Sequence, residues 1–292
     1  MKLVTYNIQY TVGKDGRFDL ERIVASVRGA DIIALQEVVR NFEGTNYSDQ
    51  AAEIGALLSD YYWAFGIETD IDASEIDAKG HVVNRRRQWG NMLLSRWPIL
   101  SARAHLLPFV GTSSHENAQS GALEGVIDTG HRALRVYSLH LSHLSERERL
   151  QQIDWLIDLN RRAWLEGGVH CFTSGEFQGR STPMPFDAIY MGDFNLHPTD
   201  KALYDRLVGP VDRDYGRVHY RDLLVDAWVA AGNAEGTGIT YPPNERYPNS
   251  PVGWYLDYCF VTPTLADRVK RAWIDSDAQG SDHQPVWFDL DL

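Results

Sequence analysis

One segment of the sequence combines residue types that could carry out hydrolysis. Gly192-Asp193-Phe194-Asn195 follows an apolar run and presents a carboxylate and an amide two positions apart. Alternate residues of an extended segment share a face, so Asp193 and Asn195 are expected to point together while Phe194 points into the core. A carboxylate beside an amide is suited to activating water next to a bound anion. Gly, Asp and Asn also favour turns, so the segment alone fits a strand that ends in a polar turn equally well.

Further polar residues stand beside other apolar runs. Asn7, Glu37 and His140 end such runs, Asp257 interrupts another, and Asp282 and His283 stand just before the last. A single acid or histidine at such a place is more often solvated or structurally bonded than catalytic. Complementary types at several strand ends are harder to dismiss. A pair of Asp257 with His283 would fix the orientation of the imidazole and favour its protonated form, because a neighbouring carboxylate stabilises the positive charge.

The residue types fit a metal-assisted attack on phosphorus. Glu37 offers hard carboxylate oxygens to Mg²⁺, with Mn²⁺ as the alternative metal, and Asn7 offers a neutral amide oxygen near it. Asp193 could deprotonate or orient water. Asn195 and His140 could donate hydrogen bonds to negative charge on phosphoryl oxygens.

Other classes of site are disfavoured by the sequence. The spacing of histidines and cysteines does not match a structural zinc site. The two cysteines, Cys171 and Cys259, form no disulfide framework, and Cys259 is expected in the core. There is no glycine-rich phosphate loop followed by Lys-Ser/Thr, which counts against a P-loop nucleotide hydrolase.

The composition limits the partners. The chain has 292 residues and a net charge of −12, which argues against coating nucleic acid by bulk electrostatics. A phosphate-bearing substrate remains compatible, because a divalent cation can reverse the local field in a cleft. No apolar run approaches transmembrane length and the first residues lack a signal core, so a cytoplasmic protein without stable membrane insertion is expected. No protein partner is inferred.

Strands alternate with helices along the whole chain, which predicts one layered α/β domain over residues 1–292. Excursions from this domain are expected at about 69–88 and 167–186, where periodicity is lost. The expected strands are 2–8, 31–35, 61–67, 90–95, 99–107, 122–128, 133–141, 255–261, 269–274 and 285–290. The expected helices are 19–27, 49–58, 145–165 and two pieces within 199–231.

The helix at 145–165 has the strongest pattern. Ser145 with Glu148 three positions later predicts a capping box, in which each side chain bonds the backbone of the other residue. The apolar stripe that should face the core consists of Leu150, Ile153, Leu156, Ile157 and Leu165.

The motifs as an ordered set resemble the endonuclease/exonuclease/phosphatase superfamily, which includes pancreatic-type deoxyribonucleases, abasic-site endonucleases, bacterial sphingomyelinases and inositol polyphosphate 5-phosphatases. The matching segments run in the family's order over nearly the whole chain. They are Thr5-Tyr6-Asn7-Ile8, Gln36-Glu37-Val38, Gly90-Asn91-Met92-Leu93-Leu94-Ser95-Arg96, Ser138-Leu139-His140-Leu141, Gly192-Asp193-Phe194-Asn195, Leu256-Asp257-Tyr258 and Ser281-Asp282-His283.

The resemblance implies a four-layered α/β/β/α sandwich, in which two mixed β-sheets pack face to face between helices. It also implies a divalent metal, with Asn7, Glu37 and Asp282 at or near it. Asp226 matches an acidic position that we interpret as structural support.

The same resemblance assigns roles to the remaining motif residues. It makes Asp193 the residue that activates the attacking water. Asn195 and His140 would contact the phosphate, and Asp257 would support His283, which contacts the scissile phosphate.

Two positions depart from the family pattern. Members often carry Arg where this chain has Tyr255, and many carry Arg where it has Ser120 before Gly-Ala-Leu. Both changes remove bidentate donors, so they concern the outer substrate contacts and leave the hydrolytic centre intact.

Three interpretations of the function follow. The favoured one is a Mg²⁺-dependent phosphoester hydrolase, preferably a phosphodiesterase, acting on a small metabolite or lipid head group. The second is an endonuclease or exonuclease that uses the same site on DNA or RNA. The net negative charge of the chain argues against this second interpretation. The third is a catalytically silent binding protein on the same fold, which the full set of site residues disfavours.

Some features leave the substrate open. The run Arg85-Arg86-Arg87 could meet an anionic substrate at the cleft rim, but the acidic residues before it favour a solvated charge run. The loop 241–258, with Trp254, Tyr247 and Arg246, could stack a base or enclose a head group, or could simply pack as an ordered loop. His143 is either a partner of the site or a surface residue.

Overall fold

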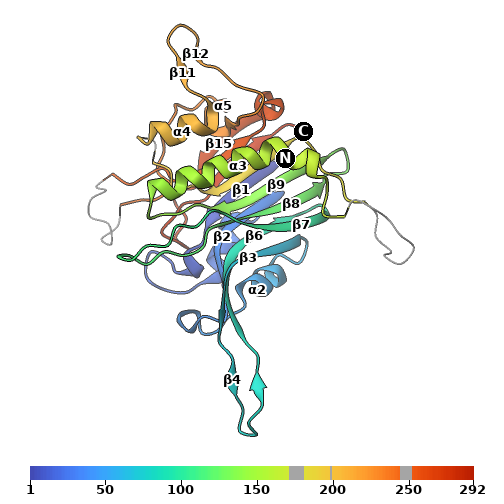
Figure 1. Cartoon of the computed structure of the whole chain (residues 1–292), viewed down its shortest axis with the longest axis vertical. Coiled ribbons are helices and arrows are strands. Elements are labelled where there is room, and N and C mark those ends of the chain that lie inside the picture. Colours follow the sequence, from blue (N-terminus) through green and yellow to red (C-terminus); the bar gives the residue numbers. More distant parts are fainter. Residues whose placement is uncertain (171–180, 198, 244–251) are drawn as a thin grey trace.

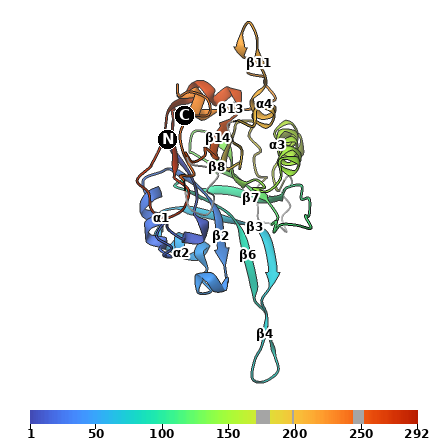
Figure 2. The same cartoon turned by 90° about the vertical axis from the view of Figure 1, so that its left-hand side faces the viewer.

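Two six-stranded β-sheets lie face to face, with helices on both outer sides (Figures 1 and 2). This computed structural model describes residues 1–170, 181–197, 199–243 and 252–292. The predicted four-layered α/β/β/α sandwich is confirmed. Each sheet is mixed, because it combines one parallel strand pair with antiparallel pairs.

The first sheet joins the two ends of the described chain. Its order is β15-β16-β1-β2-β6-β3, and its only parallel pair among the described strands is β1 with β2. The strands are β1 (Lys2–Asn7), β2 (Ile32–Arg40), β3 (Tyr62–Asp72), β6 (Arg86–Ser95), β15 (Val269–Ile274) and β16 (Val286–Leu290).

The second sheet repeats this plan with the order β13-β14-β10-β9-β8-β7, and its parallel pair is β9 with β10. The strands are β7 (Ile99–Leu106), β8 (Gly121–Asp128), β9 (Ala133–His140), β10 (Ala188–Asp193), β13 (Val225–Asp226) and β14 (Asp257–Val261). Parallel neighbours end at the same edge of a sheet, so the residues at the carboxyl ends of β9 and β10 are brought together.

The helices cover the outer faces. α1 (Leu20–Val27) and α2 (Gln50–Leu57) contribute to one apolar core with the outer face of the first sheet. α3 (Glu146–Glu166) and α4 (Lys201–Val208) contribute to the larger core, which also fills the space between the sheets. The central strands β1, β8, β10 and β14 are buried on both faces, which is why they read as nearly continuous apolar runs, whereas the edge strands β3, β7 and β15 are partly exposed.

The predicted helix starts are confirmed. Asp19, Asp49 and Ser145 each accept a hydrogen bond from a backbone N–H in the first turn of α1, α2 and α3. Such caps satisfy donors that have no partner within the helix.

Two details of α3 differ from the prediction. The Glu148 carboxylate is buried and accepts hydrogen bonds from Val110 N and Asn117 Nδ2, both at 3.0 Å, so only half of the capping box forms. Leu150 and Leu165 are 41% and 68% exposed, so the buried stripe is narrower than expected.

A polar link ties the two sheets together beside the ends of the central strands. The buried Gln36 side chain donates from Nε2 to Ser138 Oγ at 2.9 Å, and Ser138 Oγ donates to Leu35 O at 3.0 Å. Thr5 Oγ1 completes the link by donating to Gln36 Oε1 at 3.2 Å. Because buried polar groups are costly when unpaired, these bonds fix the relative placement of β1, β2 and β9.

Residues 69–88 are a β-hairpin arm, where the sequence predicted a loss of regular structure. β3 and β6 continue beyond the body of the sheet and end in a two-stranded tip, β4 (Glu75–Ile76) and β5 (Val82–Val83) (Figures 1 and 2). Ion pairs cross the arm, such as Arg86 Nε with Asp70 Oδ1 at 2.9 Å. Both faces of the arm carry charged residues, which conceals the alternation that identifies strands in sequence.

The region 199–231 holds less helix than predicted. Only α4 and the four-residue α5 (Ala227–Ala230) are helical there. Between them lie a small hairpin, β11 (Val211–Asp212) with β12 (Gly216–Arg217), and the edge strand β13. Residues 171–180 of the excursion predicted at 167–186, including Cys171, lie outside the described residues. Cys259 is buried in β14, as predicted.

Candidate active site

Three of the candidate residues form one row across the second sheet. In the strand register, Asp193 of β10 is opposite His140 of β9 on one side and Asp257 of β14 on the other. Directly opposed residues project to the same face of a sheet. The row therefore places two carboxylates and an imidazole at the edge where the parallel strands end.

Asp193 is almost fully buried and is held by hydrogen bonds from two directions. Its Oδ2 accepts from Asn7 Nδ2 at 3.0 Å, and its Oδ1 accepts from the backbone N–H of Asn195 at 2.8 Å. Asn195 has a left-handed backbone with φ 46°, so the strand does not continue as extended chain through this residue, as the sequence analysis assumed. Phe194 is fully buried, as predicted.

His283 lies between two carboxylates. Its Nδ1 is 2.8 Å from Asp257 Oδ2, and its Nε2 is 3.6 Å from Asp193 Oδ2. Burial alone would lower the pKa of His283, but the negative charges of Asp257 and Asp193 raise it well above the usual value. The ring is therefore a buried imidazolium that donates to Asp257.

His140 has the opposite charge state. Burial lowers the pKa of His140 to about 3, and the positive charges of His283 and His143 add to the shift. Asn195 Nδ2 lies 3.1 Å from His140 Nε2 and also donates to Leu141 O at 2.9 Å, so this ring nitrogen acts as the acceptor. The 3.6 Å approach of His140 Nε2 to Asp193 Oδ2 is consequently no ion pair. The expected donation from His140 to a phosphate oxygen stays a prediction.

Glu37 points into the site because β2 contains a bulge. The register with β6 shifts between Leu35 and Val38, and Glu37 adopts a left-handed backbone with φ 58°. Such strain in a residue other than glycine is found preferentially at functional sites, and a bulge redirects a side chain. Burial raises the pKa of Glu37 to about 7; the hydrogen bond from Asn7 opposes this shift, and the charge of Asp282 adds to it.

Asn7 connects the two acidic parts of the site. Its Nδ2 donates to Glu37 Oε1 and to Asp193 Oδ2, both at 3.0 Å. Its Oδ1 accepts from Gln9 N at 3.1 Å, and its backbone oxygen accepts from Ser281 Oγ at 2.7 Å. In this arrangement Asn7 orients the two carboxylates, and its service as a metal ligand stays a prediction.

Glu68 belongs to the site and was missed in the sequence. It is buried in β3, lines the same cavity as Glu37, and accepts a hydrogen bond from Asn91 Nδ2. Burial, with the charge of Glu37 added, raises the pKa of Glu68 well above the usual range. The predicted strand 61–67 ended before Glu68, whereas β3 continues to Asp72, so Glu68 was assigned to no element and was not considered for the site.

These residues line a cavity of about 450 Å³. Among the described residues that line it there is no Lys or Arg, and there are five carboxylates: Glu37, Glu68, Glu116, Asp193 and Asp282. Burial raises the pKa of Glu37, Glu68 and Asp193, so these groups are fully ionised together only when a cation neutralises them. The hard oxygen donors of Glu37, Glu68 and Asp282 suit Mg²⁺ or Mn²⁺, so the residues present fit a divalent metal.

Asp193, Asp257 and His283 also approach one another closely enough to hold an ion. In this cluster the His283 ring already pairs with Asp257 Oδ2 at 2.8 Å, and Asp193 already accepts from Asn7 and Asn195, whereas the Glu37 end offers hard oxygen donors. The Glu37 end of the cavity is therefore the better candidate for the cation.

Two pairs of aromatic rings line the cavity. Tyr10 meets Trp89 edge to face with ring centroids 5.1 Å apart, and Tyr241 stacks on Trp254 at 5.8 Å. The second pair comes from the loop 241–258, for which the sequence left open whether it contacts substrate or only packs. Arg246 and Tyr247 of that loop lie outside the described residues.

The two departures from the family pattern lie in different surroundings. Tyr255 is buried and meets Tyr258 edge to face at 4.6 Å, so it packs in the core and does not line the cavity. Ser120 does line the cavity, and it offers a small hydroxyl where an arginine is often found.

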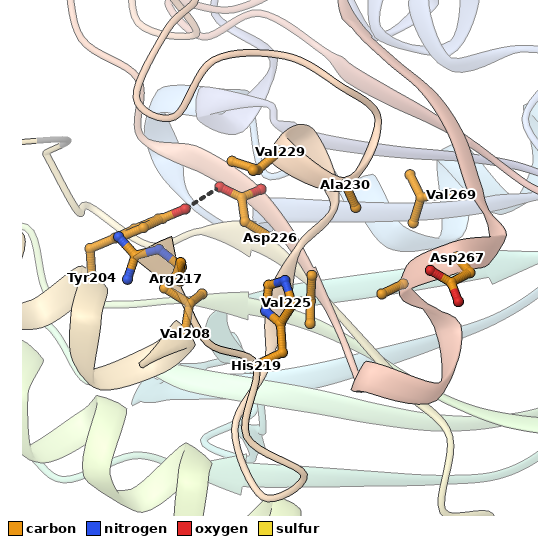
Figure 3. Close-up of a pocket in the computed structure, with 11 residues that line it drawn as sticks. Tyr204, Val208, Arg217, His219, Val225, Asp226, Val229, Ala230, Asp267 and Val269 are labelled. Carbon is orange, nitrogen blue, oxygen red and sulfur yellow. Dashed lines mark hydrogen bonds between the residues drawn. The ribbon is translucent and has the colours of Figure 1, made fainter. Parts of the chain in front are cut away.

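A second cavity, of about 400 Å³, lies beside β13 and is lined by none of the predicted site residues (Figure 3). Asp226 borders it and uses both oxygens internally: Oδ2 accepts from Tyr204 Oη at 2.9 Å and Oδ1 from Trp228 N at 2.8 Å. This is the structural use that we inferred for Asp226. Arg217, above the Tyr204 ring, is paired with Asp205 and Glu235.

Comparison with known proteins gives a family match. A family model described as "Endonuclease/Exonuclease/phosphatase family" matches residues 4–283. A search of curated proteins finds no match. No helix in the described part of the chain is both long and apolar enough to cross a membrane.

Solved structures of similar fold cover the whole chain. An endonuclease/exonuclease/phosphatase from Beutenbergia cavernae has 22% identity and a TM-score of 0.67, over 100% of this chain and 71% of that one. The mannosyl-6-phosphatase Bt3783 from Bacteroides thetaiotaomicron has 18% identity and a TM-score of 0.67, over 100% of both chains. Truncated TDP2 from Caenorhabditis elegans has 18% identity and a TM-score of 0.55, over 99% and 97% of the respective chains. At these identities the likeness establishes the fold.

Proposed function

The chain belongs to the endonuclease/exonuclease/phosphatase family, whose members are hydrolases of phosphoesters, and we propose that it is a Mg²⁺-dependent phosphodiesterase. The observation that carries the proposal is the placement of Asp193. This carboxylate is buried, fixed by Asn7 and Asn195, and faces an imidazolium and a neutral imidazole at the wall of an acidic cavity.

Asp193 is the base of the proposed reaction. Burial raises the pKa of Asp193 to about 7, while the charge of His283 opposes the shift, so the carboxylate can take up a proton near neutral pH. Its two fixed oxygens orient a water for attack on phosphorus. The expelled alcohol leaves opposite that water and receives a proton from solvent.

His283 and Asn195 would stabilise the phosphoryl group. The imidazolium of His283 is held by Asp257 and can donate from Nε2 to an oxygen on which negative charge develops. The Asn195 amide uses its two N–H groups on His140 Nε2 and Leu141 O, so it would donate to a phosphoryl oxygen by giving up the bond to His140. The imidazolium is held beforehand by Asp257, so this donor needs no reorganisation during the reaction.

The acidic residues Glu37, Glu68 and Asp282 would hold the metal. Bound there, Mg²⁺ would supply charge neutralisation of the phosphoryl oxygens. Asn7 would fix the positions of the Glu37 and Asp193 carboxylates relative to each other through its two donated hydrogen bonds.

A diester of a small molecule is the favoured substrate. The aromatic pairs Tyr10–Trp89 and Tyr241–Trp254 offer apolar surfaces for organic groups attached to the phosphate. The fold neighbours include a mannosyl-6-phosphatase and TDP2, so the fold accommodates substrates of different sizes. The absence of Lys and Arg among the described cavity residues disfavours a long nucleic acid, whose many phosphates need cationic contacts.

A panel assay with and without Mg²⁺ tests the proposal. The panel contains bis-p-nitrophenyl phosphate, p-nitrophenyl phosphate, sphingomyelin, inositol phosphates, RNA and plasmid DNA. We expect Mg²⁺-dependent hydrolysis of the small diester, and a loss of roughly 10²–10⁴-fold in Asp193→Asn and Glu37→Gln.

Glu21→Gln, a change at an exposed position of α1, serves as the control variant. Full activity of Asp193→Asn or Glu37→Gln would refute the assignment. Plasmid nicking at low enzyme concentration would replace the small-molecule substrate with nucleic acid. Inactivity on the whole panel, with no Mg²⁺ binding by calorimetry, would indicate a silent binding protein.

A further inference from the structure

The three arginines of the run Arg85-Arg86-Arg87 differ in their ion pairs. Arg85 Nη1 lies 3.0 Å from Glu75 Oε1, and Arg86 Nε lies 2.9 Å from Asp70 Oδ1. Among the described residues, no carboxylate lies within 4.0 Å of the Arg87 guanidinium. The predicted solvated charge run is thus accurate for the first two residues, and Arg87 is a different case.

Arg87 faces the cavity side of the sheet. The register of β6 is continuous from Arg86 to Trp89 against β3, so residues two apart share a face. Trp89 lines the cavity and meets Tyr10 there. Arg87 therefore follows Trp89 along the same face, about 7 Å further toward the arm.

The Arg87 side chain is half-buried and incompletely bonded. Its Nε is buried and has no hydrogen-bond partner in the described structure. The two terminal nitrogens, Nη1 and Nη2, are not among the buried unpaired atoms, and no ion pair within the described structure holds them. They are the donors open to a ligand, and the planar fork of arginine matches phosphate and carboxylate oxygens two at a time.

Arg87 is too far along the strand to serve the scissile phosphate. It is four residues from Asn91, whose amide holds Glu68 at the metal end of the cavity, and four residues of strand span roughly 13 Å. An anion at Arg87 is therefore a second group of the substrate, beyond the aromatic contact at Trp89.

We propose that Arg87, with Trp89, forms a distal subsite that binds a second anionic group of the substrate. The proposal rests on the proposed hydrolysis and narrows its substrate class to diesters that carry another phosphate or carboxylate. The acidic cavity itself contains no Lys or Arg among its described lining residues, so selectivity for such substrates depends on Arg87, which lies beyond the cavity residue Trp89 on the same face of β6.

The chain supplies matched variants for a test. Arg87→Ala removes the cation, Arg87→Lys keeps the charge and loses the fork, and Arg86→Ala removes the adjacent arginine on the opposite face. The probes are the p-nitrophenyl ester of thymidine monophosphate and the same ester with an additional phosphate on the sugar. The wild type should prefer the doubly phosphorylated ester.

In Arg87→Ala that preference should fall at least tenfold, through KM with kcat little changed, and Arg87→Lys should be intermediate. Arg86→Ala should retain the wild-type preference. Equal preference in Arg87→Ala and Arg86→Ala, or no preference in the wild type, would overturn the subsite.

A binding measurement separates this inference from the proposed reaction. Calorimetry with thymidine bisphosphate and thymidine monophosphate in the presence of Mg²⁺ requires no turnover. Tighter binding of the bisphosphate by the wild type than by Arg87→Ala supports the subsite even if no ester is hydrolysed. Equal affinity of both proteins refutes it even if the ester is hydrolysed.

Discussion

His283 donates from Nδ1 to Asp257 Oδ2 across 2.8 Å, and the other oxygen of Asp257 is buried without a partner. The carboxylate therefore depends on the imidazolium for neutralisation, and the imidazolium depends on the carboxylate for its charge. Asp257→Asn keeps an acceptor but removes the charge, which should lower the pKa of His283. We expect a loss of roughly 10–100-fold in kcat, as for carboxylates that orient other functional histidines.

The pH profile of Asp257→Asn distinguishes this role from a purely structural one. The proposed reaction needs the protonated ring of His283. The alkaline limb of the pH–activity profile should therefore move to lower pH when the pKa of His283 falls. Asp214→Asn, at an exposed carboxylate, should keep the wild-type profile. An unmoved alkaline limb in Asp257→Asn would contradict the assigned charge state.

Glu68 should affect metal affinity more than folding. Burial and Glu37 raise the pKa of Glu68, so without a cation it carries a proton near neutral pH and resembles glutamine. Glu68→Gln should therefore leave the thermal midpoint in EDTA within about 2 °C of the wild type. The Mg²⁺ concentration for half-maximal activity should rise about tenfold, as a ligand or its close support is lost. Glu43→Gln, at an exposed position, serves as the control. If Glu68→Gln needs no more Mg²⁺ than the wild type, Glu68 does not contribute to metal binding.

A buried acid outside the site makes stability depend on pH. Glu124 Oε2 accepts from Tyr137 Oη at 2.7 Å and lies 3.3 Å from His105 Nε2. Burial would raise the pKa of Glu124, but the bonds from His105 and Tyr137 lower it overall. A carboxylate with a lowered pKa stabilises the fold above its unfolded-state pKa and loses this contribution as pH falls through its folded-state pKa.

Glu124→Gln should therefore lower the free energy of unfolding by about 1–3 kcal/mol at neutral pH. Urea titrations should show the difference from the wild type shrinking below about pH 4, the ordinary range of a glutamate. A difference that stays constant with pH would show that the charge of Glu124 contributes nothing.

Gly192 fixes the approach of β10 to β9 next to Asp193. Its φ is 156°, and a Cβ atom there would lie 1.9 Å from the backbone oxygen of Leu139. Gly192→Ala should cost about 3 kcal/mol or more, because a backbone atom cannot move aside without shifting the row of Asp193 and His140. Gly44→Ala, where a Cβ would meet nothing within 4 Å, should be nearly neutral in the same urea titration. Similar midpoints for the two variants would contradict this reasoning.

The sequence predicted those parts of the molecule that depend on local pattern. Apolar runs marked the central strands. Asp193 and His140 were recognisable because each ends such a run, and Asp257 because it interrupts one. The helix caps Asp19, Asp49 and Ser145 were likewise readable from single positions.

The parts that escaped prediction depend on pairing between distant strands. The bulges that redirect Glu37 and include Glu68 exist only when β2, β3 and β6 are aligned. The different environments of Arg86 and Arg87 also follow from that alignment. The charge states of His140 and His283 depend on which carboxylates lie nearby after folding. One histidine, His140, is therefore neutral and the other, His283, is protonated.

The hydrogen bond from Ser281 Oγ to the backbone of Asn7 joins positions 274 residues apart. During synthesis Asn7 leaves the ribosome long before Ser281 and His283 are made, and β1 waits equally long for its partner β16. Pairing over such separations closes slowly. The nascent chain therefore carries Glu37, and later Asp193, without the imidazolium beside them until His283 has been made and β16 has paired with β1.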